Sequence, residues 1–130
     1  MSVPATLAAT VKAMRPMVPA KDFAISERFY LELGFTPRAL APKLVEMRLG
    51  VFAFILQDYY IREWADNFVV HLRVSDVQTW WDQIVRLDLA QRYQVKATPP
   101  RDEGWGLVAN LGDPSGVLWR IAQHPASDLS

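Results

Sequence analysis

Apolar residues recur at helical spacing in two stretches of the chain. In the first stretch Ile25, Phe29 and Leu33 recur every four residues, the spacing of the apolar stripe of an amphipathic helix. Asp22 precedes the stripe, and aspartate is a favoured N-cap because its side chain accepts hydrogen bonds from the first free backbone N–H groups. Gly34 follows the stripe, where glycine commonly ends a helix. The pattern predicts a helix between these two residues.

The second stretch has the same arrangement further along the chain. Asp76 is the candidate N-cap, as Asp22 is in the first stretch. The apolar stripe that follows it consists of Val77, Trp80, Trp81, Ile84 and Leu87. This stripe predicts a second helix, which packs its apolar face against a neighbouring element.

Short apolar runs bounded by turn residues surround both helices and predict strands. In the first half these runs span 14–20, 35–40, 44–49 and 51–57. In the second half they span 68–74, 93–97, 105–111 and 117–123, with a loop before 105 that contains Pro99, Pro100 and Gly104. Each half therefore has the order β-α-β-β-β, and the repeat lies in the order of elements rather than in residue identity.

This order predicts an α+β fold. We expect an N-terminal arm over 1–12, a first βαβββ module over 13–65, a second βαβββ module over 66–124 and a tail over 125–130.

Three predicted strands carry a basic side chain or an imidazole on one face only, because alternate residues of a strand point to opposite faces. Arg15 and Met17 share a face of the first strand, His71 and Arg73 share a face of 68–74, and Arg120 lies opposite the apolar face of the last strand. If the sheet curls, these faces line a cleft. The aromatic side chains available to that cleft are Phe52, Phe54, Trp64 and Trp105. On an open sheet the same charged residues would only face water.

Composition excludes several classes of function. Lys+Arg and Asp+Glu each number 14, so the formal net charge is zero, whereas a general nucleic-acid binder needs a basic excess. The absence of cysteine excludes a disulfide scaffold, a thiolate nucleophile and a cysteine-ligated metal. No apolar run reaches the roughly 18 residues of a membrane-spanning helix, and no basic region typical of a signal peptide precedes the first apolar stretch. We therefore expect a cytoplasmic protein with no membrane or nucleic-acid partner.

Three segments carry a resemblance to a known family. They are Lys21-Asp22 with Phe29-Tyr30-Leu-Glu-Leu-Gly-Phe35, then His71-Leu-Arg-Val-Ser-Asp76, then Trp105-Gly106 with Asp113-Pro-Ser-Gly-Val-Leu-Trp-Arg-Ile121. Together they are similar to the vicinal oxygen chelate superfamily, which holds glyoxalase I, the bleomycin resistance proteins and the extradiol dioxygenases. The Trp-Gly before Asp-Pro-Ser-Gly is most similar to the bleomycin resistance branch. Over about 14–123, the resemblance implies two paired βαβββ modules whose curled mixed sheets cup a ligand or metal, with helices on the outer face.

The resemblance also implies metal-ligand positions, two of which hold arginine here. By motif the first position is Arg15, the second-module histidine is His71 and the last position is Arg120. The remaining position lies within 51–54, which offers no ligand side chain, and the nearest carboxylate, Glu46, matches the pattern poorly. A guanidinium group is protonated and has no lone pair for a metal, and one imidazole cannot form a tight site alone. We expect no metal and no other cofactor.

Three functions remain open. The first is a non-catalytic binding protein of the bleomycin resistance type, which sequesters a small molecule in a cleft at a homodimer interface. Because Arg15 and Arg120 would repel a cationic bleomycin-type ligand, an anionic or aromatic ligand fits this cleft better. The second is a metal-dependent lyase, isomerase or dioxygenase of the same superfamily that uses His71. The third is a transcription-linked or accessory interaction module without a small-molecule ligand.

The first function assigns ligand binding to one set of residues and assigns no catalytic residue. The set consists of Arg15, Met17, Phe52, Phe54, Trp64, His71, Arg73, Trp105 and Arg120.

Overall fold

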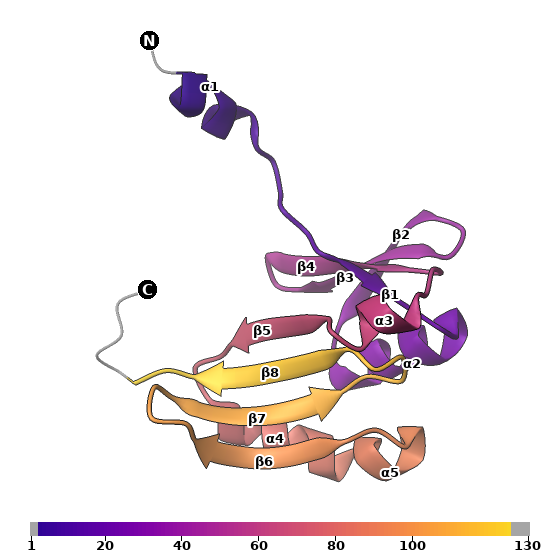
Figure 1. Ribbon diagram of the computed structural model, residues 1–130, viewed down its shortest axis with the longest axis vertical. Coiled ribbons are helices and arrows are strands. Elements are labelled where there is room, and N and C mark those ends of the chain that lie inside the picture. The colour runs from indigo at the N-terminus through magenta and orange to yellow at the C-terminus, as the bar shows by residue number, and fades with distance from the viewer. Residues whose placement is uncertain (1–2, 126–130) are drawn as a thin grey trace.

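The computed structural model describes residues 3–125, which form two four-stranded mixed sheets (Figure 1). The first sheet has the order β1-β4-β3-β2 and contains β1 (Met17–Pro19), β2 (Thr36–Ala41), β3 (Leu44–Leu49) and β4 (Phe52–Gln57). The second has the order β5-β8-β7-β6 and contains β5 (Val69–Arg73), β6 (Ala97–Asp102), β7 (Leu107–Gly112) and β8 (Leu118–Gln123). In each sheet the first strand runs parallel to the last, and the other pairs are antiparallel. The predicted α+β fold is confirmed.

Both predicted helices form, and both begin at the aspartates that the sequence indicated. In α2 (Phe23–Leu33) a side-chain oxygen of Asp22 accepts a hydrogen bond of 3.2 Å from the backbone N–H of Ile25. Gly34 ends this helix with a φ of 127°, a conformation that favours glycine. In α4 (Val77–Arg86) Asp76 accepts hydrogen bonds from the first-turn backbone in the same way.

The structure corrects one strand of the prediction. A strand over 93–97 was expected, but α5 (Leu89–Tyr93) occupies the start of that segment and ends at Gln94 in the left-handed conformation. The strand of this part of the sheet is β6, which includes Pro99 and Pro100 where a loop was expected. Proline is tolerated there because β6 is an edge strand, so its missing N–H groups leave the ladder intact.

Two further helices have no counterpart in the prediction. The short helix α3 (Arg62–Ala65) lies in the segment between the two sheets, and α1 (Val3–Thr10) lies within the expected arm. Figure 1 shows α1 away from both sheets, at the end of an extended segment. Apart from Pro125, the expected tail lies outside the described residues. None of the helices within residues 3–125 is long and apolar enough to cross a membrane. The boundary between the two modules at 65/66 stays a prediction.

One core serves both sheets, and a buried tyrosine connects them. Tyr30 of α2 is fully buried, and its hydroxyl donates a hydrogen bond of 2.6 Å to Asp113 in the turn between β7 and β8. The indole N–H of Trp119 on β8 donates to the same hydroxyl at 2.9 Å. Burial raises the pKa of Asp113 and of Tyr30, because removal from water disfavours the charged form of each. Helix α2 of the first half is thereby fixed to the second sheet.

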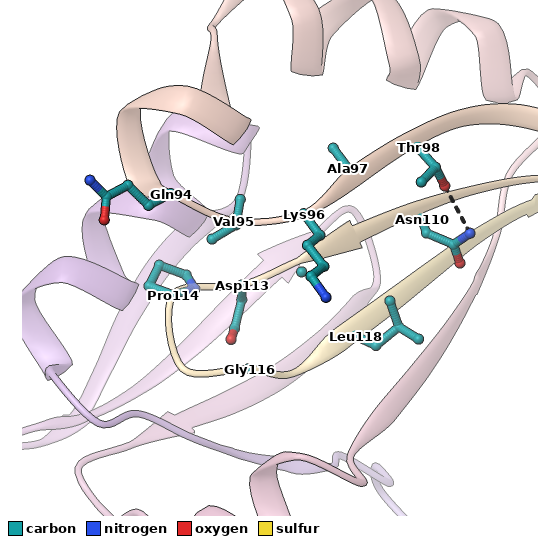
Figure 2. A pocket seen from close by; sticks show the side chains of 11 residues that line it. Gln94, Val95, Lys96, Ala97, Thr98, Asn110, Asp113, Pro114, Gly116 and Leu118 are labelled. Atoms are coloured by element: carbon teal, nitrogen blue, oxygen red, sulfur yellow. Dashed lines mark hydrogen bonds between the residues drawn. The ribbon is translucent and has the colours of Figure 1, made fainter.

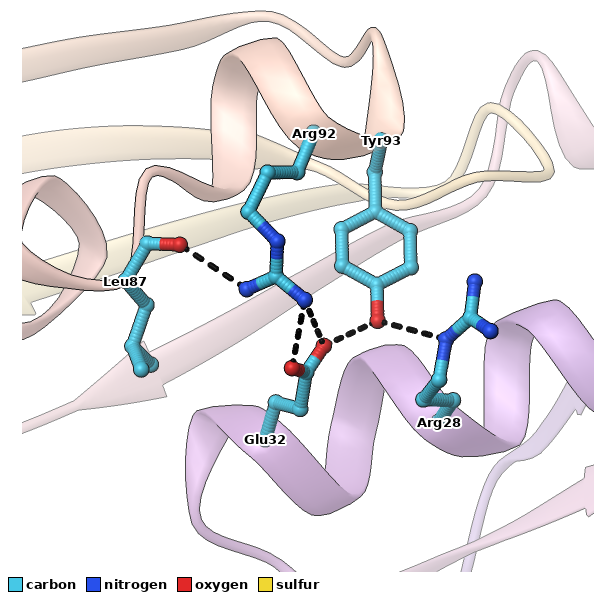
Figure 3. A network of polar contacts seen from close by, with 5 residues as sticks. All are labelled: Arg28, Glu32, Leu87, Arg92 and Tyr93. Atoms are coloured by element: carbon cyan, nitrogen blue, oxygen red, sulfur yellow. Dashed lines mark hydrogen bonds and ion pairs between the residues drawn. The ribbon is translucent and has the colours of Figure 1, made fainter.

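A second polar bridge joins the halves at the surface (Figure 3). Arg92 of α5 forms an ion pair of 2.6 Å with Glu32 of α2 and also donates to the carbonyl of Leu87 at 2.9 Å. The Tyr93 hydroxyl donates to Glu32 and accepts a hydrogen bond of 3.1 Å from Arg28. The Tyr93 hydrogen bond and Arg92 hold the pKa of Glu32 below its usual range.

Candidate functional site

Each sheet presents one face to the helices and the common core and leaves the other face open. In the first sheet Met47 and Phe54 are cross-strand partners and are both buried in the core. Their neighbours along the strands point the opposite way because side chains alternate. We call this opposite face the open face. On the first sheet it carries Met17, Arg38, Glu46, Arg48, Ala53 and Ile55.

The open face of the first sheet is organised around one carboxylate. Glu46 on β3 is only 6% exposed, and its two oxygens lie 2.7 Å from Nε of Arg15 and 3.0 Å from a terminal nitrogen of Arg48. Arg38, the cross-strand partner of Glu46, lies 3.9 Å away. The hydrogen bond from Arg15, with help from Arg48, lowers the pKa of Glu46. The carboxylate is therefore charged at neutral pH.

The open face of the second sheet holds the predicted residues His71, Arg73 and Arg120. His71 on β5 is the direct cross-strand partner of Arg120 on β8. Arg120 donates hydrogen bonds of 3.2 Å to Asn110 and 3.1 Å to Glu103. These contacts hold its guanidinium group over the sheet.

His71 also belongs to a small ring cluster at the end of this face. Its ring centroid lies 5.9 Å from that of Trp105 and 5.6 Å from that of His124, and the Nε2 atoms of the two histidines are 3.4 Å apart. Trp105 is held at this end of the sheet by the close passage of Gly106 over β8. A Cβ atom at Gly106 would lie 2.8 Å from the carbonyl oxygen of Gln123.

A cavity of about 660 Å³ lies between the two sheets, where both sheets end in open strand edges. β5 is an edge strand, and β1 pairs only with residues 55–57 of β4, which leaves 52–54 without a described neighbour on that side. Five aromatic rings line the cavity, namely Phe35, Phe52, Phe54, Trp80 and Trp119. The rest of its wall is aliphatic apart from His71 and Arg73 of β5.

The predicted ligand-binding residues lie in four places in the folded chain. Four of them line the cavity, namely Phe52, Phe54, His71 and Arg73. Arg15 and Met17 lie on or beside the open face of the first sheet, while Arg120 lies on that of the second, close to the His71–Trp105 cluster. Trp64 is apart from all of these, on α3, where its ring packs 6.4 Å from that of Tyr59.

Several residues of these surfaces were not among the predicted site residues. Glu46 and Arg48 alternate with Val45 and Met47, so strand periodicity alone could have placed them on the face of Arg15. Phe35, Trp80 and Trp119 come from separate elements that meet only in the folded chain. His124 lies beyond the last strand, and no sequence pattern indicated its approach to His71.

Two smaller hollows flank the second sheet. One, of about 420 Å³, lies at the turn between β7 and β8; Figure 2 shows Lys96 and Asp113 among the residues that line it, and a hydrogen bond from Asn110 to Thr98. Asp113 already accepts hydrogen bonds from Tyr30 and from the backbone of its own turn. The other, of about 450 Å³, lies beside Pro99 and Glu103.

The donor atoms do not fit a divalent metal at the positions that the resemblance implies. Arg15 and Arg120 occupy two of these positions, and their charged nitrogens have no lone pair. Within residues 3–125, no three His, Cys, Asp or Glu side chains come together in a group that could hold a metal ion. His71 and His124 provide only two imidazoles at one place.

The arrangement of the two sheets matches solved structures over nearly their whole length. One is a bleomycin-binding protein from bleomycin-producing Streptomyces verticillus, complexed with copper(II)-bleomycin, with a TM-score of 0.73, 20% identity and coverage of 89% of this chain and 100% of that one. Another is a bleomycin resistance determinant encoded on the transposon Tn5, with a TM-score of 0.72, 22% identity and coverage of 88% and 98%. This chain has the vicinal oxygen chelate fold.

A glyoxalase/bleomycin resistance protein/dioxygenase from Nocardioides shares the vicinal oxygen chelate fold with a TM-score of 0.63, 19% identity and coverage of 96% of this chain and 94% of that one. No protein-family model matches the chain, and no curated protein matches it. The motif residues Tyr30 and Asp113 join α2 to the turn between β7 and β8 in the second sheet.

Proposed function

We propose that the chain is a small-molecule-binding protein that holds an aromatic, anionic ligand in the cavity between its two sheets, without a resident metal. The observation that carries the proposal is the cavity itself. Its volume of about 660 Å³ falls within the range of roughly 300–1,000 Å³ for ligand pockets. Its wall is apolar and rich in aromatic rings, which favours a ligand with a flat apolar body.

Charge supports an anionic ligand over a cationic one. His71 and Arg73 lie at the wall of the cavity, and Arg15 directly precedes Pro16, another lining residue. A guanidinium group binds carboxylate, sulfonate or phosphate oxygens and repels cations. Two of the neighbours with the same fold are bleomycin-binding proteins solved with bleomycin or copper(II)-bleomycin, and this chain would use a similar scaffold for a ligand of opposite charge.

We further propose that two copies of the chain form a homodimer through apolar side chains of the open faces, which leaves the exposed Arg38 and Arg48 accessible to solvent. Apolar side chains on these faces are exposed, including Met17 at 41% and Val69 at 52%. Sedimentation equilibrium measures this directly: we expect a dimer mass at micromolar concentration. A monomer at all concentrations would contradict the proposed dimer and leave the cavity as the site of a single chain.

The binding proposal is tested by fluorescence titration with 8-anilinonaphthalene-1-sulfonate, an aromatic anion. We expect saturable binding by the native chain and about tenfold weaker binding by Phe52→Ala, which removes an exposed ring from the cavity wall. Tyr59→Ala is the matched control, since it removes an exposed ring that does not line the cavity. The proposal would be contradicted if none of three ligands, this probe, aromatic carboxylates and bleomycin, bound the chain saturably.

One observation favours a metal-dependent lyase, isomerase or dioxygenase that uses His71 as an alternative. The two Nε2 atoms of His71 and His124 lie 3.4 Å apart, which would let both imidazoles bind one ion. Metal analysis of the protein purified without chelator separates the two proposals. Stoichiometric zinc, nickel, manganese or iron that is lost in His71→Ala would support the enzyme. An interaction module is a third possibility, but we expect no cavity in such a protein.

A further inference from the structure

Three arginines converge on a single carboxylate on the open face of the first sheet. Arg15 comes from the residues before β1, Arg38 from β2 and Arg48 from β3, so the group spans the width of the sheet. Glu46 lies between them, with its oxygens 2.7 Å from Arg15, 3.0 Å from Arg48 and 3.9 Å from Arg38. We call these four residues the Glu46 cluster.

The Glu46 cluster carries excess positive charge in a chain with no net charge. Three guanidinium groups against one carboxylate leave a net charge of +2 within it, whereas the whole chain has a formal net charge of zero. Among the described residues, no second carboxylate forms an ion pair with Arg15, Arg38 or Arg48. Like charges held this close repel one another, and an added anion would relieve that repulsion.

The Glu46 carboxylate sets the geometry of the cluster. It is buried and charged, so it draws Arg15 and Arg48 toward one point and restricts their rotamers. The side chains of Arg38 and Arg48 remain 66% and 36% exposed, which leaves N–H groups for a partner from solvent. Each guanidinium group has five N–H donors in a planar fork, and Glu46 engages only part of them. The cluster is thus preorganised to accept oxygens of a second anion.

The Glu46 cluster also borders the cavity. Pro16 and Ala53 line the cavity; Arg15 directly precedes Pro16, and Arg48 is the cross-strand partner of Ala53. A ligand with its flat body among the cavity rings can therefore reach the cluster with a charged group at its edge.

We propose that the Glu46 cluster is an anion-binding site for the carboxylate, sulfonate or phosphate group of the ligand, with Arg48 and Arg38 as the residues that bind it. This inference rests on the proposed function in one respect, that the same ligand occupies the cavity. The guanidinium groups supply charge-assisted hydrogen bonds to the anion, and Glu46 keeps them in place.

Two probes with the same ring system separate the cluster from the cavity. 8-Anilinonaphthalene-1-sulfonate carries a sulfonate, and N-phenyl-1-naphthylamine has the same rings without it. We expect Arg48→Met and Arg38→Met each to weaken binding of the sulfonate about fivefold and to leave binding of the neutral probe unchanged. Added sodium chloride should weaken only the sulfonate, because salt screens charge.

Arg62→Met is the matched control. Arg62 forms an ion pair with Asp66 on α3, is 79% exposed and lies outside both the cluster and the cavity. We expect this variant to bind both probes as the native chain does. If Arg48→Met lost affinity equally for the two probes, or lost none for the sulfonate, the anion site would be overturned while the cavity proposal stands.

If neither ring probe binds, the cavity proposal is contradicted. A third probe then still tests the anion site. Inorganic pyrophosphate is titrated calorimetrically at constant ionic strength, with the native chain and the same three variants. Saturable binding of pyrophosphate by the native chain would support the site if its affinity falls about fivefold or more in Arg48→Met and in Arg38→Met but not in Arg62→Met. No saturable binding, or binding that the cluster variants leave unchanged, would overturn it.

Discussion

The indole N–H of Trp119 donates a hydrogen bond of 2.9 Å to the hydroxyl of Tyr30. Trp119 lines the cavity, whereas Tyr30 is fully buried behind it and donates in turn to Asp113. The Tyr30 ring also packs edge-on against Phe35 and Phe54, with centroids 5.7 and 4.8 Å away. One buried tyrosine thus contacts three of the five aromatic rings that shape the cavity, and Asp113 fixes its position.

Tyr30→Phe should therefore alter the cavity as well as the stability of the chain. The change leaves Oδ2 of Asp113 and the indole N–H of Trp119 without the hydroxyl that now bonds to both, which costs about 1–3 kcal/mol of unfolding free energy. We expect the indole N–H resonance of Trp119 to shift and binding of N-phenyl-1-naphthylamine to weaken. Tyr93→Phe removes a hydroxyl that bonds to Glu32 and Arg28 instead, and it should leave both readouts unchanged. Equal effects of the two variants would mean that Tyr30 supports only the fold.

Burial separates the two phenylalanines of β4 that line the cavity. Phe54 is 2% exposed and Phe52 is 74% exposed. We expect Phe54→Ala to lower the unfolding free energy by about 3–5 kcal/mol, because it removes a packed core ring. Phe52→Ala should change it by less than about 0.5 kcal/mol. Urea denaturation measures both, and comparable losses would show that Phe52 is covered in solution.

The ion pair between Glu32 and Arg92 should make stability depend on pH. The pKa of Glu32 is lowered in the folded chain, mainly by the Tyr93 hydrogen bond and then by Arg92. The folded state therefore binds this proton more weakly than the unfolded state does. Its stabilising contribution is present above about pH 4.3, the ordinary glutamate value, and is lost as pH falls through the folded pKa.

Glu32→Gln should remove this part of the pH dependence. Urea denaturation at pH 7 and at pH 3 is the measurement: the variant should lose stability at pH 7 and differ little from the native chain at pH 3. Glu27→Gln, on the same helix but outside this network, should leave the profile unchanged. A Glu32→Gln profile parallel to the native one would contradict the assignment.

Gly106 should tolerate no side chain. A Cβ atom there would lie 2.8 Å from the backbone oxygen of Gln123, so Gly106→Ala must push β7 and β8 apart. We expect a loss of about 1–3 kcal/mol in unfolding free energy and a change in the fluorescence of the adjacent Trp105. Gly112→Ala, at the other end of β7, is the control, because its Cβ would meet the chain at an ordinary contact distance of 3.6 Å. An unchanged Gly106→Ala variant would show that the two strands can separate freely here.

Local pattern determined the helices and most strands of this fold. Asp22 and Asp76 mark the helix starts because an N-cap needs only the first turn of backbone that follows it. Alternation along β3 likewise places Glu46 and Arg48 on one face whatever the sheet packs against. The loop predicted around Pro99 and Pro100 was wrong, because two prolines argue against a strand. Only the neighbouring strands decide that β6 is an edge strand, where proline is tolerated.

The residues of the candidate site are brought together only by the tertiary structure. Phe35, Phe54 and Trp119 lie far apart in the chain, and they form one wall only because α2 and β8 are joined through Tyr30. The convergence of three arginines on Glu46 likewise depends on the register of β2 and β3 and on the path of the chain into β1. The sequence by itself determined which face of each strand a residue occupies, since that follows from local geometry. Which faces and edges meet was decided by long-range packing, for which a single sequence carries no periodic signal.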